Sequence, residues 1–224
     1  MNKAANAIVT IDSLSLTFEE RKLFSNFSLT IFKGEKITVS GESGSGKSTL
    51  LKTLIAMHLP LSGTIALLGN TLETENLLKI RRQMFYLPQE ILPHSDETVL
   101  EYLEYPFSLA INKGVSFPEQ SLHQLLSELH LSSEILSQPL GRLSGGERKR
   151  IGVLCGLLLN RPLMLLDEPT AGVDAGNRDT LVNLLFGEKN RTVIAVSHDE
   201  AVHKRSDRTI ILGNGSSGAD DGSS

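Results

Sequence analysis

The chain has 224 residues, 40% of them hydrophobic and 21% charged, which are the length and composition of one globular unit able to bury a sizeable core. A net charge of −4 gives no broad basic surface for nucleic acid, and the single cysteine, Cys155, excludes an internal disulfide. No run approaches the ~18–20 apolar residues of a membrane-spanning helix, and the first residues lack the apolar segment of a secretory signal. We therefore expect a soluble protein that faces the cytosol and does not bind nucleic acid.

Short apolar runs alternate with longer segments of helical spacing from about residue 8 to residue 212, which predicts βα units around a largely parallel sheet. Four of the runs end at a glycine or a polar residue. Because ligands of open α/β sheets bind at the carboxyl ends of the strands, four separate segments would bring polar groups to one edge. These runs are Lys36–Ser40 before Gly41, Met84–Leu87 before Gln89, Leu163–Leu166 before Asp167, and Thr192–Val196 before His198.

The middle of the chain differs from the rest, because its strand-like runs disappear and four prolines interrupt helical stretches. Pro118 stands where proline is tolerated, in the first turn of a predicted helix. The last residues, GNGSSGADDGSS, have almost nothing to bury. The predicted division is a single domain over 1–212, with a core of 1–89 and 142–212 and a helical subdomain of about 90–141, followed by a disordered tail over 213–224.

The string GESGSGKST matches the phosphate-binding pattern G-x-x-x-x-G-K-[ST] directly after a predicted strand. Glycines allow several backbone N–H groups to point at phosphate oxygens, and the helix that begins near Lys47 adds the positive end of its dipole. We expect Lys47 to reach the β- and γ-phosphates and Ser48 to hold Mg²⁺. The predicted nucleotide-binding residues of this loop are Gly41, Glu42, Ser43, Gly44, Ser45, Gly46, Lys47, Ser48 and Thr49.

Two carboxylates follow the apolar run Leu163–Leu166, which has the composition of a central strand buried on both faces. We expect Asp167 to coordinate Mg²⁺ through the water shell of the metal and Glu168 to act as general base for the attacking water. The alternative, a strand that ends in solvated acids, is disfavoured by the phosphate loop upstream. A GTPase would need an Asn-Lys-x-Asp guanine reader, and this tetrapeptide does not occur.

The string LSGGE precedes a predicted helix over Arg148–Asn160. Ser144 and Glu147 form an S-x-x-E capping box, which is a sufficient local explanation for both residues. It does not explain Gly145 and Gly146, because glycine in a first turn lowers helix stability. Glycines there leave N–H groups uncovered at a positive helix end, so we predict a second anion site that faces a different direction from the first.

Together these motifs resemble those of the ATP-binding subunits of ABC transporters, and the resemblance covers residues 8–212. It implies an α/β fold of the P-loop NTPase (ABC ATPase) type, with a mostly parallel sheet, N-terminal antiparallel strands and an inserted helical subdomain. The family's motifs appear in the family's order: GESGSGKST as Walker A, Gln89 as the Q-loop, LSGGE as the signature, LMLLDEP as Walker B with Glu168 as its catalytic glutamate, Gly172–Asp174 as the D-loop and Ser197–Asp199 as the H-loop.

The resemblance also implies roles for single residues. Phe18 falls where the family places an aromatic ring that stacks on adenine, although a core phenylalanine at a strand end is the alternative. Gln89 would contact Mg²⁺ and the attacking water, and it would link the core to the helical subdomain. His198 would hold the γ-phosphate and orient Glu168, whereas an isolated histidine after a strand is equally typical of a cap.

The implied assembly is a homodimer with ATP sandwiched at its interface. In it, Ser144, Gly145 and Gly146 of one chain would face the ATP held by the other, and Asp174 would communicate across the interface. The implied activity is hydrolysis of ATP with Mg²⁺, coupled to transport through a separate integral membrane subunit, on the inner face of the cell membrane. We expect Tyr102 and Tyr105 to lie on the surface that meets that subunit.

Other members of the superfamily fit less well. The length excludes fused exporters and two-cassette translation factors, and the chain lacks the long coiled coil of DNA-repair ATPases. The alternative that remains is a soluble ATPase of an assembly machine such as the Suf iron–sulfur system, which the chain resembles in Glu147 followed by three basic residues. Among transporters, Thr98–Phe107 resembles the small iron-export type, and lipoprotein-release and macrolide-efflux types are comparably short.

Overall fold

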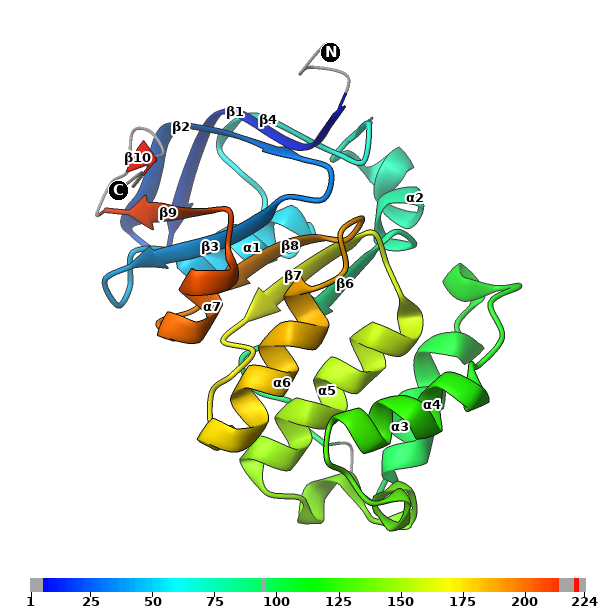
Figure 1. Ribbon diagram of the computed structural model, residues 1–224. Coiled ribbons are helices and arrows are strands. Elements are labelled where there is room, and N and C mark those ends of the chain that lie inside the picture. Colours follow the sequence, from blue (N-terminus) through cyan, green and yellow to red (C-terminus); the bar gives the residue numbers. More distant parts are fainter. Residues whose placement is uncertain (1–5, 94–95, 214–219, 222–224) are drawn as a thin grey trace.

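The computed structural model describes residues 6–93, 96–213 and 220–221 (Figure 1). In chain order, the strands and helices are β1 (Ala7–Phe18), β2 (Arg21–Phe32), β3 (Lys36–Gly41), α1 (Lys47–Leu54), β4 (Ser62–Leu67), β5 (Asn70–Thr71), α2 (Leu77–Arg81), β6 (Met84–Leu87), α3 (Val99–Ser108), α4 (Glu119–Glu128), α5 (Gly145–Leu159), β7 (Leu163–Asp167), α6 (Ala175–Phe186), β8 (Thr192–Val196), α7 (Glu200–Arg205), β9 (Arg208–Leu212) and β10 (Asp220–Asp221). Short 3₁₀ helices lie at Thr74–Asn76, Ala110–Asn112, Ser133–Ser137 and Leu140–Arg142.

The larger sheet has the strand order β10-β9-β3-β8-β7-β6 in the described part of the chain. Neighbours from β9 to β6 are parallel, and β10 pairs antiparallel with β9. The four strands predicted from the sequence are β3, β6, β7 and β8, with bounds that agree to within one residue. Because the four are parallel neighbours, their carboxyl ends meet at one edge, as the sequence predicts.

The smaller sheet is antiparallel, with the order β2-β1-β4-β5, and contains the N-terminal strands that the family resemblance implies. Its strands alternate between buried and exposed residues, so only one face packs inward. Leu50, Leu51 and Leu54 of α1 belong to the same buried cluster as inward residues of both sheets. The helix that follows the phosphate loop is therefore anchored in the interior of the molecule.

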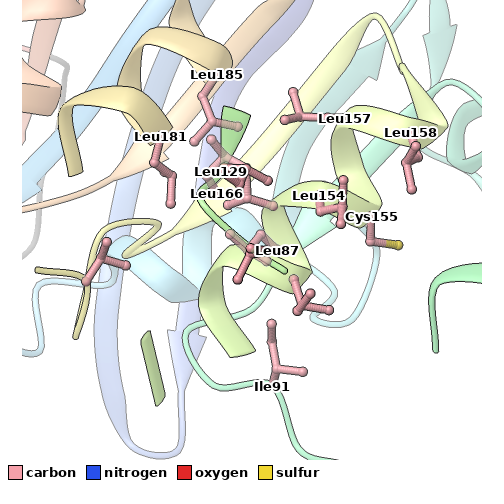
Figure 2. Packing of buried hydrophobic residues seen from close by; sticks show 14 of the residues in the cluster. Leu87, Ile91, Leu129, Leu154, Cys155, Leu157, Leu158, Leu166, Leu181 and Leu185 are labelled. Carbon is pink, nitrogen blue, oxygen red and sulfur yellow. The ribbon is translucent and has the colours of Figure 1, made fainter. Parts of the chain in front are cut away.

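Strand β7 explains why the apolar run before Asp167 is unbroken. Leu163 and Leu165 belong to the cluster shared with α1, whereas Met164 and Leu166 point to the opposite face, into a second cluster beneath α5 and α6. Figure 2 shows Leu166 in that second cluster, among leucines of α5 and α6. Both faces of the strand are buried, so no position of the run tolerates a polar residue.

Between β6 and α5 the chain forms α3, α4 and 3₁₀ turns, which lie on the side of α5 away from α6 (Figure 1). Helix α3 begins at a capping box of Thr98 and Glu101, and α4 begins at Glu119, so that Pro118 is the N-cap and not, as predicted, a residue of the first turn. Tyr105 is exposed, but Tyr102 packs against the buried cluster of α5. Tyr102 is therefore half-buried, and Tyr105 is the more accessible of the two tyrosines expected on the surface.

Helix α5 packs closely against β6. A methyl group on Gly156 would lie 2.5 Å from the ring of Phe85, and one on Gly152 would lie 2.2 Å from the side chain of Ile91. These two glycines allow the helix to approach the sheet. The close packing explains why glycine occurs in this helix interior, where it is otherwise unfavourable. Of the tail predicted to be disordered, Gly213 and β10 are described, and its other residues lie outside the described part of the chain.

Candidate nucleotide site

The loop between β3 and α1 has the shape that phosphate binding requires. Gly41 and Gly46 have φ angles of 146° and 95°, which side-chain-bearing residues rarely adopt, and a methyl group on Gly46 would lie 3.1 Å from the ring of Phe24. Lys47 is buried, and its ammonium donates to the main-chain oxygens of Gly41 at 2.8 Å and Glu42 at 2.9 Å. The loop thus curls around the lysine at the N-terminus of α1, where backbone N–H groups favour anions.

Ser48 and Asp167 join the phosphate loop to the end of β7. The Ser48 hydroxyl donates to Asp167 Oδ1 at 3.0 Å, although the two residues are far apart in the sequence. Burial raises the pKa of Asp167, and the hydrogen bond from Ser48 opposes the shift. A hydroxyl beside a carboxylate provides the hard oxygen ligands that Mg²⁺ prefers, so the donors present fit this metal.

Glu168 leaves the sheet immediately after β7. Its φ of 48° places it in the left-handed region, and its N–H donates to the Val196 carbonyl at 2.9 Å. Its carboxylate oxygen lies 3.8 Å from His198 Nε2, at the end of the neighbouring strand. Burial raises the pKa of Glu168, opposed by the His198 ring and backbone, and a less acidic carboxyl is a stronger general base. The backbone strain at Glu168 is typical of functional sites.

A cavity of about 530 Å³ lies at this edge of the sheet, within the size range of small-molecule sites. Because it adjoins the phosphate loop, we call it the phosphate cavity. It brings together predicted residues from five separate segments. Phe18 is 42% exposed at the end of β1, and the T-shaped contact of its ring with His58 places the ring centroids 5.3 Å apart. The interpretation of Phe18 as a core residue is therefore excluded. The lining residues are Phe18, Glu19, Arg21, Leu23, Ser43, Gly44, Gly46, Lys47, Ser48, Thr49, Gln89, Glu168, Val196 and His198.

Four of the residues predicted in the phosphate loop and at the end of β7 do not line this cavity. Gly41 and Glu42 contact Lys47 through their carbonyl oxygens, as described above, and the Ser45 side chain is buried. Asp167 lies beneath the cavity, in contact with Ser48. Gly41, Glu42 and Asp167 therefore hold Lys47 and Ser48 in position rather than form the cavity wall.

One signature residue, Gly145, lies at a second cavity of about 590 Å³. Gly145 lines it and has open space around it, whereas a methyl group on Gly146 would lie 2.5 Å from the Gly172 carbonyl. The two glycines are thus needed for different reasons, since one is exposed and the other contacts the D-loop. Gln89 lines both cavities. In one chain the phosphate loop and Gly145 therefore line different cavities.

Ser144 and Asp174 are helix caps within the chain. Ser144 forms the predicted capping box, because its hydroxyl accepts from the N–H of Glu147 at 3.2 Å and the Glu147 carboxylate accepts from its N–H at 2.9 Å. Asp174 precedes α6 and accepts from the N–H of Asn177 at 3.1 Å. Hydrogen bonds from Asn177 lower the pKa of Asp174. Neither residue lines the phosphate cavity, so a role toward nucleotide would require a second chain.

Lys149 is a site residue that sequence reasoning missed. It lies on α5 and is only 4% exposed, and its ammonium donates to the carbonyl of Gln89 at 2.7 Å and of Pro88 at 3.1 Å. Burial lowers the pKa of Lys149, and the charges of Asp167 and Glu168 oppose that shift. The sequence signal was the basic run after LSGGE, which by composition alone indicates a solvated surface.

Arg21 was also missed. It lines the phosphate cavity, and a methyl group on Gly44 would lie 2.9 Å from its Nη1, so the guanidinium lies over the phosphate loop. The register pairs Arg21 with Phe18 across the β1–β2 hairpin. The hairpin loop, Glu19-Glu20, has none of the usual turn signals, so no local pattern indicates this pairing.

Residues 24–171 match the family model described as ABC transporter. The chain belongs to this family. Over 92% of its length it is 31% identical to a probable ABC transporter ATP-binding/permease protein of Haemophilus influenzae, of which it spans 38%. Over 86% of its length it is 32% identical to the ergothioneine transport ATP-binding protein EgtV of Helicobacter pylori, of which it spans 91%.

Solved structures agree with this membership. A dimeric, post-hydrolysis structure of the ATP-binding cassette MJ0796, bound to ADP and Pi, superimposes with a TM-score of 0.82 and 27% identity, and the match covers 95% of this chain and 96% of that one. These matches confirm the family resemblance and the fold class. They also confirm the class of enzyme, which is an ATP-binding ABC ATPase. Among the described residues, no helix is both long and apolar enough to cross a membrane.

Proposed function

We propose that this protein binds Mg²⁺ and ATP in the phosphate cavity and hydrolyses ATP to energise transport through a separate membrane subunit. The proposal rests on two pairs of interacting side chains that lie at the same edge of the sheet. Ser48 contacts Asp167 beside the phosphate loop, and Glu168 faces His198 at 3.8 Å. The first pair supplies ligands for a cation and the second supplies a base, which are the groups that phosphoryl transfer to water requires.

Each residue has a distinct task in this mechanism. Mg²⁺, held by Ser48 with Asp167 and Gln89 nearby, would neutralise charge on the phosphates. Lys47 and the loop N–H groups bind the β- and γ-phosphates, and Phe18 offers a ring face to adenine. Glu168 accepts a proton from the attacking water, and His198 orients Glu168 and the γ-phosphate.

The functional unit we propose is a homodimer. In a single chain Ser144, Gly145 and Gly146 do not line the cavity of the phosphate loop, and Gly145 lines a different cavity. A second chain placed head to tail would bring its uncovered helix end to the γ-phosphate. The dimeric state of MJ0796 supports this arrangement.

The transport role implies a membrane partner and a place in the cell. EgtV is named as a transport ATP-binding protein, and the Haemophilus relative as an ATP-binding/permease protein. We propose that the chain is peripheral on the inner face of the cell membrane. Its core of 1–89 and 142–212 would bind nucleotide, and its helical subdomain of about 90–141 would bind the partner. Tyr105, which is 65% exposed on α3, is our candidate contact.

The alternative of a soluble assembly ATPase depended on the basic run after Glu147. All three basic side chains of that run bond to carbonyl oxygens of the same chain: Arg148 to Leu143, Lys149 to Gln89 and Arg150 to Leu129. The run is therefore explained by the fold itself. Purification from membranes distinguishes the two functions, because an integral membrane partner supports transport and a soluble scaffold overturns it.

Calorimetry with ATP and Mg²⁺ tests the nucleotide site. Lys47→Ala removes the cation at the centre of the loop and should abolish measurable binding, whereas Lys79→Ala, on the exposed face of α2, should bind like the parent. Chelation of Mg²⁺ by EDTA should stop hydrolysis in the parent. Binding of ATP by Lys47→Ala with parental affinity would refute the assignment of the loop.

A further inference from the structure

The ring of His198 lies 3.8 Å from Glu168, and the residues on either side of His198 are fixed by contacts of their own. The His198 side chain is 60% exposed, so little packing restrains the imidazole. The two flanking residues, in contrast, are well fixed. Ser197 is fully buried, and its hydroxyl accepts from the N–H of Asp199 at 3.1 Å. Asp199 in turn caps α7 by accepting from the N–H of Ala201 at 3.0 Å.

The second carboxylate oxygen of Asp199 is bound by a residue of another helix. Arg178 Nε, on α6, lies 3.1 Å from Asp199 Oδ2, an ion pair without the alignment of a hydrogen bond. The Asp199 side chain is 14% exposed and that of Arg178 is 40% exposed, so water screens this pair less than a surface pair. Asp199 thus has two separate partners, a helix end and a cation, immediately after His198.

The turn of α6 that carries Arg178 is itself held from the opposite side. Asn177 Nδ2 donates to Asp174 Oδ2 at 2.7 Å, and the Asn177 amide oxygen lies 2.8 Å from His130 Nδ1. Because the amide nitrogen donates to Asp174, the amide oxygen is the acceptor and His130 carries its hydrogen on Nδ1. His130 follows α4, so the first turn of α6 connects the helical region to the H-loop.

We propose that Arg178 is a positioning residue for His198, and that it acts through Asp199 from a turn that also carries the D-loop residue Asp174. The inference rests on the proposed role of His198 in hydrolysis. Without Arg178, Asp199 keeps its cap on α7 but loses the partner that fixes its second oxygen. The backbone of residues 197–199 then gains freedom, and the imidazole moves relative to Glu168.

The first test is steady-state hydrolysis by Arg178→Ala. Since a displacement of about 1 Å in a catalytic group can cost up to about 10²-fold in rate, we expect kcat to fall by about 10- to 100-fold while KM for ATP stays at the parental value. Arg178→Lys keeps a cation and should recover part of the loss. The control is Lys204→Ala, which breaks the exposed i,i+4 pair with Glu200 on α7 and should leave kcat unchanged.

Two further measurements separate positioning from general damage. In a double-mutant cycle with His198→Ala, Arg178→Ala should have little additional effect, because its target is absent. In NMR spectra of the histidine rings, Arg178→Ala should shift the His198 signal, assigned by its absence in His198→Ala, and Lys204→Ala should not. Additive losses in the cycle, or an unmoved His198 signal, would overturn the inference.

The inference and the proposed function fail in different ways. If His198→Ala hydrolyses ATP at the parental rate, the role of His198 in the proposed function is wrong. If His198→Ala hydrolyses ATP more slowly than the parent but Arg178→Ala retains its parental kcat, the function stands and the positioning role of Arg178 alone is refuted.

Discussion

The ammonium of Lys149 lies 2.7 Å from the carbonyl oxygen of Gln89, and this contact joins the helix after the signature to the loop that leaves β6. The same nitrogen lies 3.5 Å from the carbonyl oxygen of Asp167, at the end of β7. A buried cation is unfavourable unless its hydrogen bonds are satisfied, and here carbonyl oxygens of two site segments satisfy it. Lys149 therefore keeps the Q-loop, the Walker B strand and α5 in a fixed relationship.

We predict that Lys149→Gln lowers both stability and turnover. The shorter, neutral side chain leaves buried carbonyls without a donor, which costs about 1–3 kcal/mol in the free energy of unfolding. Gln89 also loses its support at the cavity edge, so the rate of hydrolysis should fall. Urea denaturation and steady-state hydrolysis measure the two effects. Lys113→Gln, at an exposed lysine, is the control, and equal behaviour of the two variants would contradict the role assigned to Lys149.

A second prediction concerns adenine recognition by Phe18. Loss of base stacking typically costs about 1–3 kcal/mol, so Phe18→Leu should weaken ATP binding by about 5- to 150-fold, and Phe18→Tyr should bind like the parent. Calorimetry gives the affinities. Phe107→Leu provides a matched control, because Phe107 forms a similar edge-to-face contact, with Phe117, away from the cavity. Parental affinity in Phe18→Leu would show that the ring only packs against His58.

A third prediction uses Cys155 as a reporter of folding. Burial raises the pKa of the Cys155 thiol to about 12, so about one molecule in ten thousand carries the thiolate at pH 8. Ellman's reagent should therefore label the native protein slowly and the guanidinium-unfolded protein at once. Labelling should increase with denaturant in step with unfolding followed by circular dichroism. Fast labelling of the native protein would show that α5 opens locally at this position.

The sequence predicted the parts of the site that depend on local pattern. The glycines of the phosphate loop and the unbroken apolar run of β7 each have one dominant structural explanation, and the strand ends therefore fell within one residue of their observed places. The inward face of α3 was not predicted, although the spacing of its side chains indicates that face. Val99 and Leu103 are buried, and Tyr102 lies beside them at the i, i+3, i+4 spacing of an inward face, whereas Tyr105 does not.

Partners across the fold could not be predicted in the same way. Lys149 donates to Gln89 because α5 packs closely on β6, and that approach depends on the absence of a side chain at Gly152 and Gly156. Arg178 meets Asp199 because α6 and α7 pack side by side. In both cases the sequence shows a charged residue on a helix, and only the tertiary arrangement selects its partner.

The last prediction is that Glu168→Gln accumulates as a homodimer with ATP bound. The amide keeps the shape of the side chain but cannot accept the proton of water, a loss typically worth about 10²–10⁴ in rate, so ATP persists between the chains. The γ-phosphate is the charge that both helix ends bind, and ADP lacks it. Size-exclusion chromatography should therefore show a dimer with ATP and a monomer with ADP.

The dimer should also depend on the signature. Adding Ser144→Arg to Glu168→Gln places a long side chain where Gly145 leaves the helix end open, so the dimer should be lost while each chain still binds ATP. Adding Ser121→Arg instead, on the exposed side of α4, introduces the same charge away from the interface and should leave the dimer intact. A Glu168→Gln protein that stays monomeric under saturating ATP would refute the homodimer, and it would direct the search to a different ATPase subunit as partner.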